Sequence, residues 1–336
     1  MIEGPYLLFL GEATDPIAVK TARGVAQWRR ENCLGEHALS GCTVSLGLPA
    51  MTPAEAAGKG AKSYVLGLAN AGGTISDTWI DAILDALDAG LHIVSGLHRR
   101  LASVPAIRER AEMLGLRLID IRHSDVPLPT GKGKIRTGKR LLTVGTDCSV
   151  GKMYTTLALE AEMKKRRISA DFRATGQTGI LIAGSGLPID AVISDFISGA
   201  VELLTPDAAD DHWDLIEGQG SLFHPSYAGV SLGLLHGAAA DALVVCHEPG
   251  RPHMRSLPHY ALPGLEETIE SNLAFARRTN RNASLVGISL NTSMLSHAEA
   301  AKICADTASN FGVPCVDPLR MGVATIVNEL EGLSRP

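Results

Sequence analysis

Short apolar runs alternate with longer stretches of mixed polarity along most of the chain. The runs have the length of strands, and the stretches between them repeat apolar residues at helical spacing. Strands that alternate with helices in this way are typical of an α/β layer architecture. Before residue 125 the pattern predicts strands at 6–11, 63–69, 91–96 and 116–121 and helices at 18–30, 78–90 and 104–115.

The same pattern restarts at Lys139 and continues toward the end of the chain. It predicts a mostly parallel sheet that is covered by helices on both faces. In such sheets, ligands bind at the carboxyl ends of the strands. The predicted strands of this second part are 140–145, 169–173, 213–216, 242–246, 284–290 and 314–316.

A segment rich in proline, glycine and basic residues, VPLPTGKGKIRTGKR, separates the two parts. Such a composition does not build a core and is typical of a linker. We therefore predict a Rossmann-like α/β domain at 1–125, a linker at 126–139 and a second α/β domain at 140–336. The positive charge of this segment is best explained if the segment is a connection exposed to solvent. Contact of its basic residues with an extra phosphate of a nucleotide ligand is the alternative. The basic residues are Lys132, Lys134, Arg136, Lys139 and Arg140.

Composition narrows the classes of function. The chain has 336 residues, of which 45% are hydrophobic and 20% charged, values typical of a globular protein with about two domains. The net charge of -5 and the aromatic content of 4% argue against nucleic-acid binding, which relies on a positive field and on stacking side chains. No G-x-G-x-x-G fingerprint indicates a nicotinamide cofactor. A small-molecule partner is therefore expected, together with a homo-oligomeric state.

Cysteine spacing and the first residues indicate a compartment. The six cysteines include no C-x-x-C pair, which argues against a zinc site and against a disulfide framework. The apolar run at 6–10 is short and is flanked by Glu3 and Glu12, unlike the core of a signal peptide. No stretch approaches the ~20 apolar residues of a membrane span. We expect a cytoplasmic protein without a membrane partner.

The stretch VGTDCSVGKMYT lies between a predicted strand and a predicted helix and fits a phosphate-binding loop with the spacing G-x-x-x-x-x-G-K. In such loops backbone N–H groups and a helix N-terminus surround an anion, and a lysine adds a point charge. A tight strand-to-helix turn is the less favoured alternative. The residues expected to bind the ligand are Gly145, Thr146, Asp147, Cys148, Ser149, Val150, Gly151, Lys152, Met153 and Tyr154.

Met153 occupies the position at which such loops normally carry the hydroxyl that holds magnesium. Magnesium requires oxygen ligands in octahedral geometry, and a thioether provides none. Thr155 and Thr156 lie farther along the helix and are not obvious substitutes. We therefore expect no metal, and we expect a ligand whose diphosphate needs none, such as coenzyme A.

Polar residues after two other predicted strands extend the candidate site. Glu217 follows the strand 213–216 and would accept a proton from a substrate amine, if its surroundings favour the protonated form. A structural carboxylate is an equally weighted alternative. Gln219 and Ser221 are candidates for positioning a substrate or stabilising an oxyanion. Arg173 is a candidate for binding a substrate carboxylate, with a surface ion pair as its alternative.

Two further stretches give weaker signals. CHEPGRPHMR does not match H-E-x-x-H, so it does not indicate zinc. An anion-binding or substrate-binding loop and simple surface polarity explain it equally well. Asn291 ends the strand 284–290, a place where related loop proteins often contact a purine edge, and it is therefore included among the cofactor-binding candidates.

Two resemblances add to this interpretation. The loop GTDCSVGK, with EGQGS and the strand ending at Asn291, resembles dethiobiotin synthetase, but Met153 replaces the threonine that follows its lysine. A larger set of motifs, in order along nearly the whole chain, resembles the D-glutamate N-acetyltransferase family. These motifs are VSGLH, VGTDCSVGKM, ATGQTGILI, EGQGSLFHP, GVSLGLLHG and GISLNT.

The second resemblance implies acetyl transfer from acetyl-CoA to the amine of D-glutamate, and a partner dehydrogenase that acts on the product. The loop would then hold the CoA diphosphate, so that direct transfer gains from proximity. The amine needs a base and the developing oxyanion needs donors. Glu217 is the expected base with Asp147 as its rival, and Lys152 and Ser221 are the expected donors. The expected substrate-binding residues are Arg173, Gln177, Thr178 and Gln219.

Two alternatives stand beside this function. One is an ATP-dependent and magnesium-dependent ligase or kinase of the dethiobiotin synthetase type. The other is a non-catalytic nucleotide-binding switch, against which the chain lacks the early extra lysine of known switches of this loop class.

Overall fold

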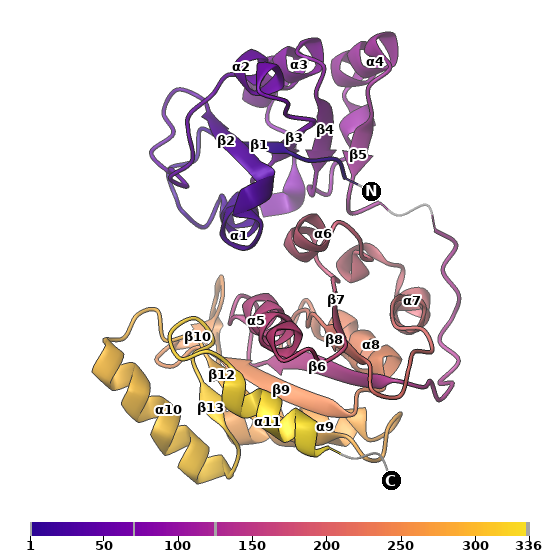
Figure 1. Ribbon diagram of the computed structural model, residues 1–336, viewed down its shortest axis with the longest axis vertical. Helices are drawn as coiled ribbons and strands as arrows, with labels where there is room; N and C mark the ends of the chain where they lie inside the picture. Colours follow the sequence, from indigo (N-terminus) through magenta and orange to yellow (C-terminus); the bar gives the residue numbers. More distant parts are fainter. Residues whose placement is uncertain (1, 70, 124–125, 334–336) are drawn as a thin grey trace. The chain divides into compact units, whose positions relative to one another are not determined.

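The computed structural model describes residues 2–69, 71–123 and 126–333, and the chain divides into two compact units. One unit comprises Met1–Val126 and Gln177–Ala191, and the other comprises Pro127–Gly176 and Val192–Pro336 (Figure 1). Residues 177–191 thus pack with the N-terminal unit, although they follow the first helix of the other unit in sequence. The chain therefore passes between the units at three points, after residues 126, 176 and 191.

The N-terminal unit is built on a parallel sheet with the strand order β2-β1-β3-β4-β5. This order is that of a doubly wound α/β fold and confirms the predicted fold class. The four predicted strands are present, and β2 is an additional one. Its sequence CLGEHA has few apolar residues to signal a strand. The strands are β1 (Tyr6–Gly11), β2 (Cys33–Ala38), β3 (Ser63–Leu66), β4 (His92–Ser95) and β5 (Leu118–Asp120).

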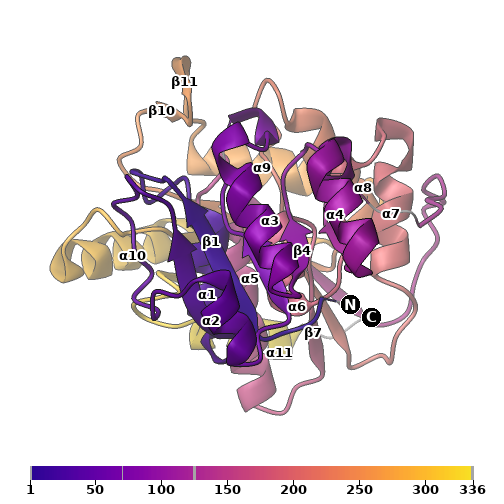
Figure 2. The same ribbon diagram turned by 90° about the horizontal axis from the view of Figure 1, so that it is seen from above.

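Local signals set the ends of several helices in this unit. Thr52 and Glu55 form a capping box at the start of α2. Pro105 starts α4, and Gly115 ends it in the left-handed conformation that glycine adopts at low cost. Figure 2 shows α3 and α4 side by side, and α1 packs against α6. The helices are α1 (Lys20–Trp28), α2 (Pro53–Gly58), α3 (Ile80–Asp88), α4 (Pro105–Leu114) and α6 (Gln177–Ala183).

The second unit is built on a parallel sheet with the strand order β13-β12-β9-β6-β8-β7. Every strand predicted for this part of the chain is present. A short antiparallel hairpin, β10 (His253–Met254) with β11 (Leu257–Ala261), was not predicted. The strands of the main sheet are β6 (Lys139–Gly145), β7 (Ala170–Arg173), β8 (Trp213–Ile216), β9 (Ala242–His247), β12 (Ser284–Leu290) and β13 (Cys315–Val316).

Helices cover both faces of this sheet. Leu141 of β6 lies in a core cluster with Leu159 of α5 and Ile326 of α11. Successive strand residues point to opposite faces, and the next residue, Leu142, lines a small cavity together with Leu234 of α8 on the other side. The helix after β6 therefore covers one face and the helix after β8 covers the other. The helices are α5 (Lys152–Lys165), α7 (Ile197–Leu204), α8 (Ala228–Ala238), α9 (Leu265–Ala276), α10 (His297–Phe311) and α11 (Ala324–Gly332).

That arrangement places the phosphate-loop candidate where ligands bind in doubly wound sheets. β6 and its neighbours β8 and β9 send their following helices to opposite faces, which leaves a crevice at the carboxyl ends of these strands. The loop after β6 opens at this edge, as do the loops after β8 and β9. The sheet topology thus brings together segments that are about 70 to 100 residues apart in sequence.

Residues 126–138 of the predicted linker form no helix or strand, while Lys139 begins β6, and the charge of this segment is not simply solvated. Lys132 and Lys134 are exposed. Arg136 and Arg140 are only 5% and 3% exposed, which corrects the expectation of a solvated run at these two positions. The Arg136 guanidinium donates to carbonyl groups of Thr205 and Gly237, at 2.8 and 2.6 Å, because a buried cation needs acceptors.

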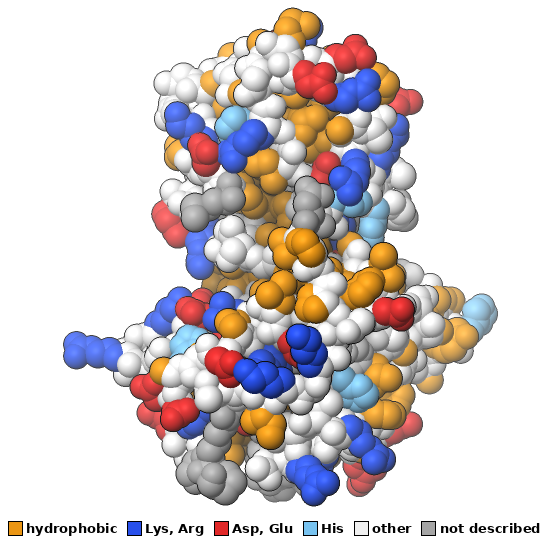
Figure 3. Space-filling model, turned by 90° about the vertical axis from the view of Figure 1, so that its right-hand side faces the viewer, with side chains coloured by type: hydrophobic (Ala, Val, Ile, Leu, Met, Phe, Trp, Pro, Cys, Tyr) orange, Lys and Arg blue, Asp and Glu red, His pale blue; other side chains and the backbone are white. Residues whose placement is uncertain are grey.

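The surface agrees with the modest net charge. On the face drawn in Figure 3, acidic and basic side chains are interspersed among uncharged ones. No helix in the described part of the chain is long and apolar enough to cross a bilayer.

Candidate functional site

The loop between β6 and α5 has the strand-loop-helix context that its sequence predicts. Gly145 lies against the Cys246 carbonyl group, where a Cβ atom would come within 2.8 Å of the oxygen. Ser149 and Gly151 have φ values of 55° and 106°. Left-handed residues within such a loop turn successive N–H groups toward one side, which creates a concave site for an anion.

The N–H groups of this loop and of the first turn of α5 are largely without acceptors. Thr146 is an exception, because it donates to the Cys246 carbonyl group at 3.1 Å. The first N–H groups of a helix have no intrahelical acceptor and carry partial positive charge. In the described part of the chain, no acceptor contacts the backbone N–H groups of Asp147, Ser149, Val150, Gly151, Lys152 and Met153.

Lys152 adds a buried cation to these donors. Its side chain is 7% exposed, and Nζ donates to the backbone carbonyl group of Asp147 at 2.7 Å. Burial lowers the pKa of Lys152, while the nearby Cys148, Cys246, Asp147 and Glu217 act in the opposite direction. An ammonium group in this setting gains from an anionic ligand that replaces its lost hydration.

The hydroxyl groups nearest to Met153 on α5 are used within the protein. Thr155 Oγ1 donates to the Gly151 carbonyl group at 3.0 Å, and Thr156 Oγ1 donates to the Lys152 carbonyl group at 2.8 Å. Both side chains are fully buried. Both hydroxyl groups are therefore engaged by backbone carbonyl groups of the loop and of α5.

The loop after β9 holds the phosphate loop in place. The Arg251 guanidinium donates to Asp147 Oδ2 at 2.8 Å and to the carbonyl groups of Cys148 and Ser149 at 2.9 and 3.2 Å. It also forms an ion pair with Glu248. The Arg255 backbone N–H donates to the same Asp147 oxygen at 2.7 Å. Part of the stretch CHEPGRPHMR thus supports the phosphate loop, and the side chain of Arg251 is bound to oxygen atoms of that loop.

Asp147 keeps one oxygen free. Its side chain is fully buried, and Oδ1 has no hydrogen-bond partner among the described residues. An Asp147 oxygen, Cys148 Sγ and a ring nitrogen of His224 all lie within 4.8 Å of one another. In the described part of the chain, this is the group whose ligand atoms are close enough to hold a metal ion.

The Glu217 carboxylate lies at the end of β8 and is 5% exposed. Its Oε2 accepts the N–H groups of Thr175 and Gly176 at 3.0 and 3.1 Å. Gly218 follows, and a Cβ atom there would lie 1.7 Å from the Thr143 carbonyl oxygen and 2.9 Å from Lys152 Cδ. The backbone after β8 therefore approaches the base of the phosphate loop closely, and Glu217 fixes the chain beyond β7.

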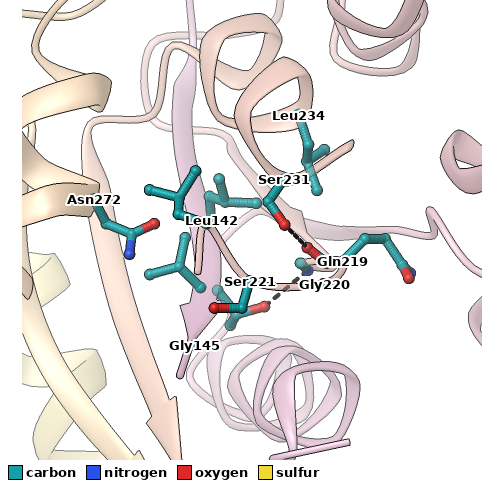
Figure 4. A pocket seen from close by; sticks show the side chains of 12 residues that line it. Leu142, Gly145, Gln219, Gly220, Ser221, Ser231, Leu234 and Asn272 are labelled. Atoms are coloured by element: carbon teal, nitrogen blue, oxygen red, sulfur yellow. Dashed lines mark hydrogen bonds between the residues drawn. The ribbon is translucent and has the colours of Figure 1, made fainter. Parts of the chain in front are cut away.

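A small cavity lies beside these residues, between β6, the loop after β8, α8 and α9 (Figure 4). Ser221 lines it, is 2% exposed and accepts the Phe223 N–H group on Oγ at 3.3 Å. Ser231 donates to the Gln219 carbonyl group at 2.7 Å. The Gln219 side chain points away from the cavity in Figure 4 and donates to Thr175 Oγ1 at 3.1 Å. Gln219 and Ser221 thus hold the turn that follows Glu217.

Other predicted site residues have partners of their own. Arg173 Nε donates to Asp214 Oδ1 at 2.6 Å, and because Asp214 is buried this ion pair is not the surface pair given as the alternative. Asn291 Nδ2 donates to Glu248 Oε2 at 3.1 Å, so that it joins the loop after β9. Gln177 and Thr178 belong to α6 of the N-terminal unit, where Gln177 contacts the Gly96 carbonyl group and Thr178 donates to Thr21 Oγ1.

Two residues at the site were not predicted. His224 is quoted within EGQGSLFHP without a role, and Arg251 stands among several polar residues of CHEPGRPHMR. In the sequence, each of the two residues can be recognised only as a polar residue in a loop after a strand of the parallel sheet. Many other polar residues have such a position. The distinguishing facts are spatial, because both residues meet Asp147 across the sheet edge.

Comparisons with known proteins agree on both parts of the chain. A model of the family described as "Domain of unknown function (DUF1611_C) P-loop domain" matches residues 129–327, and one described as "Domain of unknown function (DUF1611_N) Rossmann-like domain" matches residues 35–124. The crystal structure of a DUF1611 family protein from Anabaena variabilis has a TM-score of 0.88 and 30% identity, over 98% of this chain and 100% of that one.

Two curated relatives are similar along almost their whole length. A D-glutamate N-acetyltransferase from a Pseudoalteromonas species is 55% identical over 329 residues, which cover 98% of this chain and 99% of the relative. A D-glutamate N-acetyltransferase from Tritonibacter scottomollicae is 52% identical over 330 residues, with the same two coverages.

Proposed function

The chain belongs to the DUF1611 family, and from this premise we propose that it is an N-acetyltransferase that moves the acetyl group of acetyl-CoA to the amine of D-glutamate. The names of the two relatives and the six motifs in the sequence support this activity. Acetyl-CoA is a co-substrate in this reaction, and no metal takes part in it. An ATP-dependent ligase is less favoured, because Met153 offers magnesium no oxygen.

One observation supports the coenzyme site above all others. The loop after β6 presents N–H groups without acceptors around a buried ammonium group, but no hydroxyl at position 153. The donors suit a diphosphate, and the missing hydroxyl suits a diphosphate that is bound without being cleaved. CoA carries such a group, and its thioester would then lie near the carboxyl ends of the strands.

The chemistry requires a proton acceptor near the acetyl carbon. The amine nitrogen attacks the carbonyl carbon, the nitrogen loses a proton, and the C–S bond breaks to release the CoA thiol. Of the two carboxylates considered, Asp147 is better placed to accept the proton because Oδ1 has no partner among the described residues. Glu217 already accepts two backbone N–H groups on Oε2, so we assign it to holding the chain that follows β7.

Three further assignments belong to the proposal: composition suggests the compartment, the frequency of symmetric oligomers suggests the oligomeric state, and the family resemblance suggests the partner enzyme. We place the reaction in the cytoplasm, in a homo-oligomer, and upstream of a dehydrogenase that acts on the N-acetylated product. Arg173 and Gln219, which belong to the same unit as the phosphate loop, remain candidates for the substrate carboxylates, although Arg173 would have to exchange its bond to Asp214 for a bond to the ligand.

A direct assay tests the proposal. Purified protein is mixed with acetyl-CoA and either D-glutamate or L-glutamate, and free thiol is followed together with the mass of the amino-acid product. We expect thiol release that depends on D-glutamate and continues in the presence of a chelator. Magnesium-dependent ATP hydrolysis without thiol release for any amino acid would show that the ligase alternative is correct.

A further inference from the structure

His224 is held in one orientation at the mouth of the phosphate loop. It is 4% exposed, and its ring stacks on Tyr227 with a centroid distance of 4.4 Å and an interplanar angle of 25°. Its carbonyl group accepts the N–H groups of Tyr227 and Ala228, both at a turn that leads into α8. The backbone and the ring are therefore both fixed before any ligand binds.

The hydrogen bonds of His224 decide which ring nitrogen carries the proton. Nδ1 lies 3.1 Å from the backbone N–H group of Ser226, which can only donate, so Nδ1 is an acceptor. A neutral imidazole with an acceptor at Nδ1 carries its hydrogen at Nε2. Burial lowers the pKa of His224; the Asp147 carboxylate acts against this, and the Lys152 ammonium group adds to the lowering.

This tautomer makes the Nε2–H group a donor and not a base. Within the described parts of the chain, the His224 ring makes its side-chain hydrogen bond through Nδ1, and Nε2 makes none. A metal ion bound to Nε2 would need a lone pair on that nitrogen, so the hydrogen would have to move to Nδ1. The Nδ1–H group would then face the Ser226 N–H group, and two donors cannot form a hydrogen bond with each other. The fixed tautomer therefore argues against using the Asp147, Cys148 and His224 group as a metal site through Nε2.

Asp147 and His224 lie close together at this site. A ring nitrogen of His224 and a carboxylate oxygen of Asp147 are within 4.8 Å of each other, and Asp147 Oδ1 is buried without a partner among the described residues. Acyl transfer to an amine needs both functions at one carbon: a donor for the oxygen that becomes negative and an acceptor for the proton of the nitrogen.

We infer that His224 is a catalytic residue whose Nε2–H group stabilises the oxyanion formed when the amine attacks the acetyl thioester, a role that rests on the proposed function. As the N–C bond forms, the carbonyl electron pair moves to oxygen, which accepts a hydrogen bond from Nε2. The nitrogen passes its proton to Asp147 Oδ1. The electron pair then returns to re-form the carbonyl group, the C–S bond breaks, and CoA leaves as a thiolate that takes the proton.

Two substitutions at His224 test the donor role. Glutamine places an amide Nε2–H group close to the position of the imidazole Nε2, whereas alanine removes the donor. We expect His224→Ala to lower kcat on the order of 10²–10³-fold, as removal of an oxyanion donor does elsewhere. The KM for acetyl-CoA should change far less, because the interaction is made only in the transition state. His224→Gln should recover most of the lost rate.

Several controls keep the test decisive. His236→Gln removes another partly buried histidine of the same unit, one whose pKa burial also lowers, and should leave kcat unchanged. Acetyl-CoA affinity by calorimetry and unfolding by circular dichroism show whether each variant is folded. The pH profile of His224→Gln should match that of the wild type between about pH 6 and 8, since a neutral donor does not titrate.

The outcomes that overturn the inference are specific. A folded His224→Ala variant with kcat within about tenfold of wild type shows that the donor is not needed. A folded His224→Gln variant as slow as His224→Ala, with normal acetyl-CoA affinity, shows that the imidazole acts as a base or a metal ligand. If the wild-type protein itself releases no thiol with D-glutamate, the proposed function fails, and this result is distinct from either outcome at His224.

Discussion

The guanidinium group of Arg251 binds Asp147 at 2.8 Å and saturates only one of its two carboxylate oxygens. The bond holds the charge and direction of the carboxylate while Oδ1 stays available. Because Arg251 also binds two loop carbonyl groups, it links the shape of the phosphate loop to the position of the proton acceptor.

Replacement of Arg251 should therefore affect both stability and binding. Arg251→Ala leaves a fully buried carboxylate without its cation, and we expect a loss of about 3 kcal/mol in the free energy of unfolding. Arg251→Lys keeps the charge but loses the planar fork, and we expect acetyl-CoA affinity to fall by about tenfold. Arg255→Ala is a matched control, because Arg255 binds Asp147 through its backbone. Urea unfolding and calorimetry measure both effects, and equal behaviour of the two arginine sites would contradict this role.

Lys152 should dominate the affinity for the diphosphate. Lys152→Ala removes a buried ammonium group that has one hydrogen bond to the described protein, and we expect the Kd for CoA to rise by about 10–100-fold. Lys164→Ala, an exposed lysine farther along the same helix, should have no effect. An unchanged Kd in Lys152→Ala would place the CoA diphosphate elsewhere.

Position 153 should control magnesium dependence. For the wild type we expect the affinity for ATP or CoA to be the same with magnesium and with a chelator, because Thr155 and Thr156 donate to backbone carbonyl groups. Met153→Thr restores an oxygen at the metal position, and we expect magnesium to increase its affinity for ATP by about tenfold. Met153→Val, with a similar shape and no hydroxyl, is the control. Tighter ATP binding with magnesium in the wild type would contradict a metal-free loop.

Stability should decline as pH falls below neutrality. Burial lowers the pKa of His37, His224 and His247 in the folded chain. The unfolded chain then binds more protons than the folded one just below the ordinary histidine pKa of about 6.5. The contribution of these residues is present above about pH 6.5 and is lost progressively as pH decreases. We expect the urea midpoint to fall between pH 7 and 5.5.

A histidine variant checks the origin of that slope. His247→Gln should reduce the pH dependence, because one group that takes up a proton on unfolding is gone. His259→Gln, on the exposed β11, should leave it unchanged. Identical slopes in all three proteins would assign the acid sensitivity to carboxylates.

Strands and their ends can be predicted from this sequence more readily than the directions of the side chains. Period and apolar content predict the strands before Gly145, Glu217 and Asn291, so the loops at the sheet edge are predictable too. β2 is missed because Glu36 is buried by local hydrogen bonds to residues 45–48, which no periodicity reveals. His224 is missed because its importance lies in a tautomer that the Ser226 N–H group selects.

The assignment of residues to domains is limited in the same way. Gln177 directly follows Gly176, and nothing in the apolar pattern separates α6 from the helices of the second unit. Its packing against α1 and its contacts with residues such as Gly96 assign it to the first unit. Contacts of this kind depend on the whole fold and not on a window of sequence.

The path of residues 177–191 has a practical consequence for anyone who recombines members of this family. The two family models divide the chain between residues 124 and 129, which assigns α6 to the P-loop part. In a chimera joined between residues 124 and 129, α6 from one parent would pack against α1 from the other. A chimera that also transplants residues 177–191 keeps that pair from a single parent. The second design should therefore retain the melting temperature of its N-terminal donor, and the first should not.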